Sequence, residues 1–425
     1  MSLEAIFGFF FLLTLVGVPI AFAIGAVSLL YIGLTGVPLL VVGQRMVAGA
    51  DSFPLLAAPL FMLAGTIMNA GGITQRLLRL SDALVGHVPG GLAQVNVFSS
   101  LLMAGMSGSA TADAAGQGST MIPAMVRSGY SRGMSAAVTS ASSVIGPIFP
   151  PSVPFVIYGA VAQVSVGQLF IGAIVPGLMM TIVLMLTVYL LSRKAGYRTR
   201  ASFSGSELLG ALRSSALDLV LPVLIVGGLI GGVFTPVEAA AIAVMYALLL
   251  EVVIYRGIAP RDLPGLLVTA GKIAAIVMFV IAVSNAFGWI LVREGAGRVV
   301  SQGLLGLTTD PQLLRILLVV LLLVLGLFIE TIVLIILIVP ILVSLGPHLA
   351  MDPVHLGVSV VFTIMLGLIT PPVGLCMFIV NSIARISVAE YTRAILPYFG
   401  SLVVCAFAIA LVPGLTTILP GLLMR

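Results

Sequence analysis

The feature that most constrains the fold of this chain is a succession of apolar segments, most of them about as long as one membrane crossing. An α-helix needs roughly 20 apolar residues to span the hydrocarbon core of a bilayer. Two segments, 3–33 and 216–255, are too long for one crossing and contain a Gly/Pro break, so each is expected to be a pair of shorter helices. The other segments lie at about 53–72, 92–126, 134–162, 168–192, 268–292, 312–346, 355–383 and 394–423.

Composition excludes a water-soluble fold. Hydrophobic residues make up 60% of the 425 residues and charged residues only 8%, whereas a soluble domain carries roughly 25% charged residues. No connection between the apolar segments is long and polar enough to fold on its own. We therefore predict an all-α polytopic membrane protein whose surroundings are the lipid bilayer, and we expect no nucleic-acid partner.

Residues with catalytic or metal-binding chemistry are sparse. The two cysteines, Cys376 and Cys405, lie within apolar segments, and the three histidines lie at segment ends without the spacing of metal ligands. No nucleophile–base pair at a useful spacing is visible. We therefore expect the protein not to be an enzyme, and we interpret both cysteines as packing residues.

The basic residues around segment 92–126 indicate how this segment meets the membrane. Arg76 and Arg79 precede it and Arg127 and Arg132 follow it, so the positive-inside bias places both of its ends in the cytoplasm. Such a segment is either a re-entrant hairpin or two full crossings. Its centre is rich in small and polar residues, which favours the re-entrant hairpin.

A second hairpin is predicted in the other half of the chain. The connection 346–355 has no Lys or Arg and is interpreted as periplasmic, whereas Arg261 and Arg385 mark cytoplasmic connections. Segment 312–346 then enters from the side opposite to the first hairpin.

The two hairpins belong to an internal repeat. Asp113 and Pro123 are ten residues apart, as are Glu330 and Pro340, and a double proline follows in each half, at 150–151 and 371–372. The acids are displaced by 217 positions and the double prolines by 221. Halves that enter the membrane from opposite faces are the signature of an inverted-topology transporter. We predict a first repeat over 1–200, with a broken helix at 134–162, and a second over 201–425, with a broken helix at 355–383.

The double prolines predict two cation sites. Proline removes an amide donor and disfavours helix in the preceding residue, so carbonyl groups at each break lose their partners. Unpaired carbonyls inside a membrane are costly unless something binds them, and a dehydrated sodium ion binds oxygen atoms. A single such motif is better explained as a proline kink packed against a neighbour, but two matched motifs, each opposite a polar hairpin, favour ion sites. The predicted first site combines Ser107 with backbone oxygens of Gly146, Phe149 and Pro151, and the second combines Gly367, Thr370 and Pro372 with the hairpin tip near Gly326.

Other polar residues are candidates for solute binding or gating. Asp113 and Glu330 are carboxylates in apolar surroundings, where such groups usually face a cavity or a partner; alternatively they cap the second arm of each hairpin. Ser109 and Thr111 offer hydroxyl groups at the first tip, and exposed helix N-termini there suit an anionic solute. Arg293 follows the single tryptophan and is either a solute partner or an interface anchor.

The motifs of both halves resemble the large membrane subunit of the tripartite ATP-independent periplasmic (TRAP) transporters. Gln117 is a departure, since the family usually has a small or apolar residue there. The resemblance covers essentially the whole chain and rests on 106–115 (MSGSATADAA), 121–125 (MIPAM), 129–130 (GY), 136–139 (AAVT), 141–143 (ASS), 145–147 (IGP), 150–152 (PPS), 157–159 (IYG), 234–240 (FTPVEAA) and 367–374 (GLITPPVG).

This resemblance implies a function. It implies sodium-driven uptake, across the bacterial inner membrane, of an organic acid such as a C4-dicarboxylate or a sialic acid-like solute. A periplasmic substrate-binding protein would deliver the solute and a small membrane subunit would accompany this chain. It also implies an elevator motion, in which a transport domain of hairpins and broken helices moves past a fixed scaffold. The alternatives are a stand-alone ion-coupled symporter or exchanger of related architecture, and a channel or membrane scaffold without coupled transport.

Overall fold

The structure is a computed structural model that describes residues 3–197 and 202–424, apart from the side chains of Leu15, Ser107 and Ser344. Helices and short connections make up the described residues, and no strand occurs among them. Six helical stretches in these ranges are long and apolar enough to cross a membrane. The predicted all-α membrane architecture is therefore confirmed.

The first half of the chain contains the elements up to α10. Its helices are α1 (Leu3–Leu15), α2 (Ile20–Thr35), α3 (Leu40–Ala50), the 3-10 turn η1 (Phe53–Leu56), α4 (Ala57–Ala70), α5 (Ile73–Val85), α6 (Gly91–Ser107), α7 (Ala110–Arg127), α8 (Arg132–Ser143), α9 (Val153–Ala162) and α10 (Val166–Ala195). The apolar run at 3–33 is a pair of helices, as predicted, because Gly17 adopts a φ of 92° and Pro19 then starts α2.

The second half of the chain contains the remaining elements. They are α11 (Gly205–Ile230), α12 (Pro236–Leu248), the π-helical η2 (Leu249–Ile254), the turn η3 (Pro260–Asp262), α13 (Leu263–Arg293), α14 (Ala296–Leu307), α15 (Pro311–Gly326), α16 (Thr331–Leu349), α17 (Pro353–Met365), the turn η4 (Leu366–Ile369), α18 (Leu375–Ala384), α19 (Val388–Leu411) and α20 (Gly414–Leu423). The predicted break at Thr235-Pro236 is confirmed, since Thr235 and Glu238 form a capping box at the start of α12.

Each predicted hairpin is a pair of helices, and each predicted broken helix is interrupted at its double proline. The hairpin pairs are α6 with α7 and α15 with α16, and the broken helices are α8 with α9 and α17 with α18. In both breaks the Pro–Pro peptide bond is cis. The side from which each pair enters the membrane stays a prediction.

Two amphipathic helices precede the hairpins and were not among the predicted segments. Both begin after a glycine in the left-handed region: α5 follows Gly72, whose φ is 92°, and α14 follows Gly295, whose φ is 74°. Glycine adopts this conformation without the steric penalty of other residues. The chain thus changes direction sharply before each hairpin.

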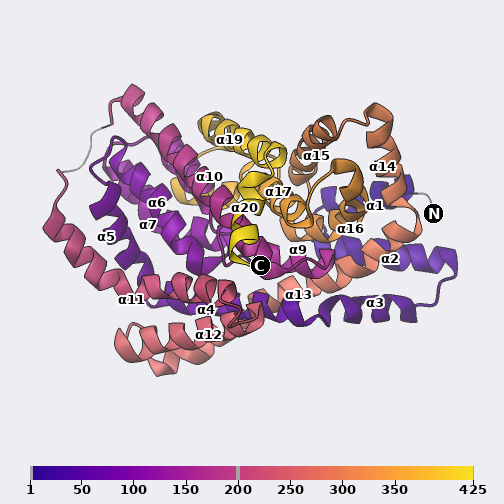
Figure 1. Ribbon diagram of the computed structural model, residues 1–425, viewed down its shortest axis with the longest axis horizontal. Coiled ribbons are helices and arrows are strands. Elements are labelled where there is room, and N and C mark those ends of the chain that lie inside the picture. Colours follow the sequence, from indigo (N-terminus) through magenta and orange to yellow (C-terminus); the bar gives the residue numbers. More distant parts are fainter. Residues whose placement is uncertain (1–2, 198–201, 425) are drawn as a thin grey trace.

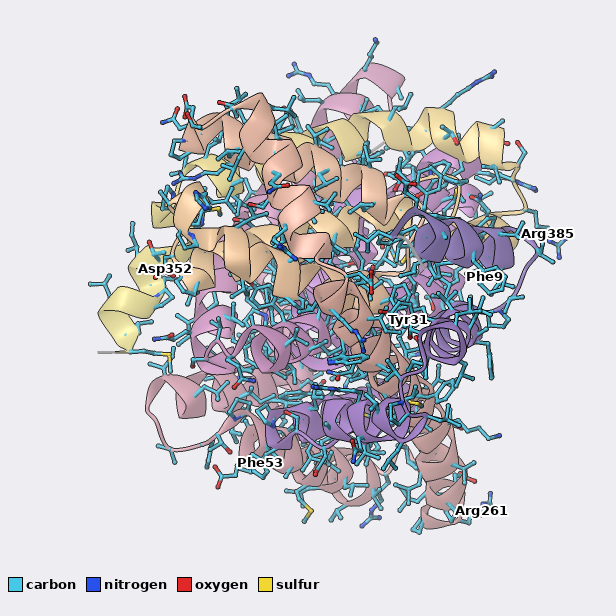
Figure 2. The ribbon with its side chains drawn as sticks, turned by 90° about the vertical axis from the view of Figure 1, so that its right-hand side faces the viewer. Phe9, Tyr31, Phe53, Arg261, Asp352 and Arg385 are labelled. Atoms are coloured by element: carbon cyan, nitrogen blue, oxygen red, sulfur yellow. The ribbon has the colours of Figure 1, made fainter. Side chains whose placement is uncertain are left out.

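Each amphipathic helix lies beside the hairpin that follows it, and the two resulting groups lie at opposite ends of the molecule (Figure 1). Figure 1 shows α5, α6 and α7 at one end of the long axis and α14, α15 and α16 at the other, with α9, α17 and α20 between them. Figure 2 shows Arg261 and Arg385 on one side of the molecule and Asp352 on the other. The positive-inside bias predicts that the two arginines share the cytoplasmic side, and which side faces the cytoplasm stays a prediction.

Candidate ion and solute sites

The tip of the first hairpin contacts the first break. Gly108 links α6 to α7 with a φ of 56°, and a Cβ at this position would lie 3.2 Å from the carbonyl oxygen of Pro151. Ser109 caps α7 by accepting from the amide of Ala112 at 3.4 Å, and its hydroxyl lies 3.2 Å from that of Thr111. Ser107 ends α6, but its side chain lies outside the described part of the chain, so its role as a ligand stays a prediction.

Asp113 faces the first break. It lies in the first turn of α7 and only 1% of its surface is exposed. A Cβ built on Gly146 would collide with its Oδ2 atom. The second break reaches the same place, because α18 packs against α7 and α8 and its Cys376 lies near Ser143 and Asp113. Residues more than 200 positions apart therefore meet around this carboxylate.

Several backbone carbonyl oxygens at the first break accept no hydrogen bond from the described residues. The Ser152 hydroxyl donates to the carbonyl of Pro147, and the amide of Phe149 donates to Ile145 at 2.8 Å. In the described ranges, no donor reaches the carbonyl oxygens of the three predicted backbone ligands, which are Gly146, Phe149 and Pro151. This arrangement fits the predicted cation site.

The tip of the second hairpin contacts the second break. A Cβ on Gly367 would collide with the carbonyl group of Gly326 at the end of α15, whose carbon would lie 2.8 Å away. Glu330 caps α16, accepting from the amides of Ile332 at 3.0 Å and Val333 at 3.2 Å. This geometry favours the capping alternative for Glu330. Asp113 by contrast lies within the first turn of α7, so the two acids share their spacing to a proline but not their position in the helix.

The second break differs from the first in its hydrogen bonds. Thr370 donates its hydroxyl to the carbonyl of Gly367 at 3.1 Å, and the amide of Gly374 donates to the carbonyl of Thr370 at 2.9 Å. The carbonyl oxygen of Pro372 accepts from no donor in the described residues. The amide of Thr370 also donates to the carbonyl of Gly367, at 3.3 Å, so both lone pairs of that oxygen already accept hydrogen bonds. The carbonyl oxygens of Thr370 and Pro372 retain the capacity to bind a cation.

Arg293 shares the ring of Trp289 with a second arginine. Its guanidinium carbon is 5.4 Å from the centre of the Trp289 ring, and that of Arg45 is equally far from the same ring. Two cations stacked on one indole, at the end of a membrane-length helix, favour the interface-anchor alternative.

A buried polar network inside the first hairpin was missed by the sequence analysis. The Gln117 amide donates to the backbone carbonyl of Asn96 at 2.7 Å and to its side-chain oxygen at 2.9 Å, and it accepts from Ser100 at 2.9 Å. Asn96 donates in turn to Thr139 of α8 at 2.6 Å. The signal in the sequence is the spacing of Asn96 and Ser100, which places both on one face of a helix. The unusual Gln117 thus joins α6 to α7.

Known proteins are similar to this chain over most of its length. A profile of the family described as "Tripartite ATP-independent periplasmic transporter, DctM component" matches residues 7–415. The sialic acid TRAP transporter large permease protein SiaM of Vibrio cholerae is 38% identical over 421 residues, which are 99% of this chain and 98% of that protein. The isethionate TRAP transporter permease protein DctMQ of Oleidesulfovibrio alaskensis is 36% identical over 99% of this chain and 66% of that protein.

A solved structure shares the fold. The YdaH transporter of Alcanivorax borkumensis superposes with a TM-score of 0.59 at 14% identity, covering 87% of this chain and 86% of that one. The family match over nearly the whole chain identifies a transport subunit and not an enzyme. The chain belongs to the DctM family of TRAP transporter large permease subunits, and it is a multi-pass protein of the bacterial inner membrane.

Proposed function

We propose that this chain is the permease subunit of a secondary transporter that couples sodium entry to the uptake of an organic acid. A periplasmic substrate-binding protein delivers the acid, and a small membrane subunit completes the complex. Both partners are inferred from the family, whose description is that of a tripartite system. The two relatives are named for sialic acid and for isethionate, a carboxylate and a sulfonate, so an organic anion is the solute class that they support.

The observation that carries sodium coupling is the pair of contacts between a hairpin tip and a helix break. Gly108 lies against Pro151 in the first half, and Gly326 lies against Gly367 in the second. Each contact brings backbone oxygens from two elements together in apolar surroundings, where a dehydrated cation supplies the missing partner. We propose one sodium ion at each contact, with the ligands predicted above, and Asp113 as the charge that balances the first.

An elevator motion is the transport mechanism that this arrangement supports. The order of an amphipathic helix, a hairpin and a broken helix occurs in both 1–200 and 201–425, which supports an inverted repeat. Since α18 packs against α7 and α8, both candidate ion sites belong to one body. We propose that this body is the transport domain, which carries the solute at Ser109 and Thr111, and that α2, α3, α4, α11, α12 and α13 form the scaffold.

The test is uptake into proteoliposomes that contain the chain, the small subunit and the cognate binding protein. A thermal-shift screen of the binding protein against carboxylates and sulfonates first identifies the solute. Uptake that requires both partners and an inward sodium gradient supports the proposal. Undiminished uptake without sodium would refute the coupling, and sodium-driven uptake by this chain alone would favour the stand-alone symporter or exchanger.

A further inference from the structure

A buried group of ionisable side chains lies where α4 meets α5 and shares no residue with either candidate ion site. Arg76 of α5 donates from Nε to Asp218 of α11 at 2.7 Å and from a terminal nitrogen to Glu251 of η2 at 2.5 Å. Both carboxylates are 0% exposed, whereas the Arg76 side chain is 16% exposed. We call Arg76, Asp218 and Glu251 the α5 cluster. It fastens the first amphipathic helix to the helices on which it lies.

The charges of the α5 cluster do not balance if both acids are ionised. Two carboxylates then face one guanidinium, which leaves one negative charge in a site where both carboxylates are buried from solvent. The charged side chains of the cluster besides Glu251 are Arg76, which pairs with it, and Asp218, which binds the same guanidinium. The remaining titratable neighbours are Tyr255, whose ring centre is 3.8 Å from the Arg76 guanidinium, and Tyr246, which donates its hydroxyl to a backbone carbonyl. Neither tyrosine supplies a positive charge.

One oxygen atom of the cluster has no partner. Oε1 of Glu251 accepts from Arg76, but Oε2 is buried and has no hydrogen bond to any described group. Oε2 lies beside Gly71 and Gly257: a Cβ on Gly257 would be 3.0 Å from Oε2 and 2.5 Å from the carbonyl oxygen of Gly71. Two oxygens that can only accept therefore face the same small space. A proton on Oε2 converts one of them into a donor.

From this geometry we propose that Glu251 is a proton-binding site, held as a neutral carboxylic acid that fastens α5 beside a charge-balanced Arg76–Asp218 pair. The proton removes the excess negative charge and gives Oε2 a donor function toward the backbone at Gly71. Asp218 is the ionised partner, because both of its oxygens accept from Arg76, at 2.7 and 3.1 Å. This site does not depend on the proposed sodium coupling.

Two isosteric substitutions within the same cluster test the proposal, because it predicts opposite results for them. Glu251→Gln replaces the acid O–H with an amide N–H donor, so the melting temperature of the purified chain should stay within about 2 °C of the parent. Asp218→Asn removes the countercharge of Arg76 and should lower the melting temperature by roughly 5 °C or more. The reverse order, or equal losses for both variants, would overturn the assignment.

Two further measurements keep the test decisive if Asp218→Asn fails to fold. The infrared spectrum of the parent should show the carbonyl stretch of a buried protonated carboxyl group at neutral pH, and Glu251→Gln should lack it. Raising the pH removes the proton, so alkaline conditions should destabilise the parent more than Glu251→Gln. A parent spectrum that Glu251→Gln leaves unchanged, or two variants with the same alkaline loss, would show that Glu251 carries no proton.

Discussion

Single glycines set how closely the hairpin tips approach the helix breaks. The backbones of Gly326 and Gly367 are in direct contact, so a methyl group on Gly367 would clash with the carbonyl group of Gly326. Overpacking of this kind costs about 1–3 kcal/mol, and it would push apart the oxygens of the second candidate ion site. We therefore expect Gly367→Ala to lower the apparent sodium affinity, measured from the sodium concentration that gives half-maximal uptake, by roughly 5- to 150-fold.

The matched control for this variant is Gly346→Ala, which lies in α16, where a Cβ would meet no atom within 4 Å. It should transport as the parent does. Equal sodium affinity in the two variants would show that Gly367 does not contribute to the second ion site.

Asp113 provides the second prediction at this scale. Asn has nearly the same shape, so Asp113→Asn keeps the contact with Gly146 while removing the charge. We expect normal membrane insertion and uptake reduced by about tenfold or more, which corresponds to roughly 1.4 kcal/mol. Asp262→Asn, at a side chain 62% exposed, is the control and should leave uptake unchanged. Parent-like uptake kinetics in Asp113→Asn would remove this residue from the site.

Which residues carry unusual chemistry was predictable from the sequence, but their neighbours were not. An acid or a double proline in an apolar segment stands out in any reading, because both are costly in a membrane. The meeting of Cys376 with Ser143 beside Asp113 depends on how α18 packs against α8, and no local pattern encodes that contact. Cys376, interpreted as a packing residue, thus lies beside the candidate site.

At the scale of helices, the first hairpin is held together by polar contacts as well as apolar packing. Gln117→Leu would leave the side-chain oxygen of Asn96 without its donor and would remove one of the two acceptors of Ser100, in a buried interface between α6 and α7. Each stranded polar group costs about 1–3 kcal/mol, so the melting temperature should fall. Ser119→Ala, on the exposed face of the same helix, should change stability by no more than about 0.5 kcal/mol. Equal melting temperatures would show that the network is dispensable.

The apolar helices and their breaks could be predicted, whereas the amphipathic ones could not. Long apolar runs and prolines act locally, so α10, α13 and the break before α12 lie where the sequence places them. In α5 and α14 the apolar residues lie on one face of the helix and the polar residues on the other. Their sequences therefore contain no continuous apolar run that would reveal a helix. The structure adds these two helices before the hairpins, at the points where Gly72 and Gly295 turn the chain.

At the scale of the whole molecule, the proposed motion requires the hairpins to slide past the scaffold. The two hairpins lie at opposite ends of the long axis (Figure 1), with α9 and α17 of the broken helices between them. Sequence analysis predicted two related halves from spacing alone, but the pattern does not state which surfaces slide. The proposed motion would place one such surface where α6 of the first hairpin meets α11, at the close contact of Gly105 with Pro222.

That contact allows a direct test of the elevator. A Cβ on Gly105 would lie 2.8 Å from the Cβ of Pro222, and a disulfide needs about 3.5–4.5 Å, so a shift of roughly 1 Å allows a bond between Gly105→Cys and Pro222→Cys. If α6 moves against α11 during each cycle, oxidation should abolish uptake and reduction should restore it. The control pair, Gly49→Cys with Asn285→Cys, joins α3 to α13 inside the proposed scaffold, where the two residues are in close contact. Its oxidation should leave uptake intact, because no relative motion is required there. Full uptake with the Gly105–Pro222 pair cross-linked would mean that this boundary does not slide, and loss of uptake in both pairs would mean that the scaffold itself must flex.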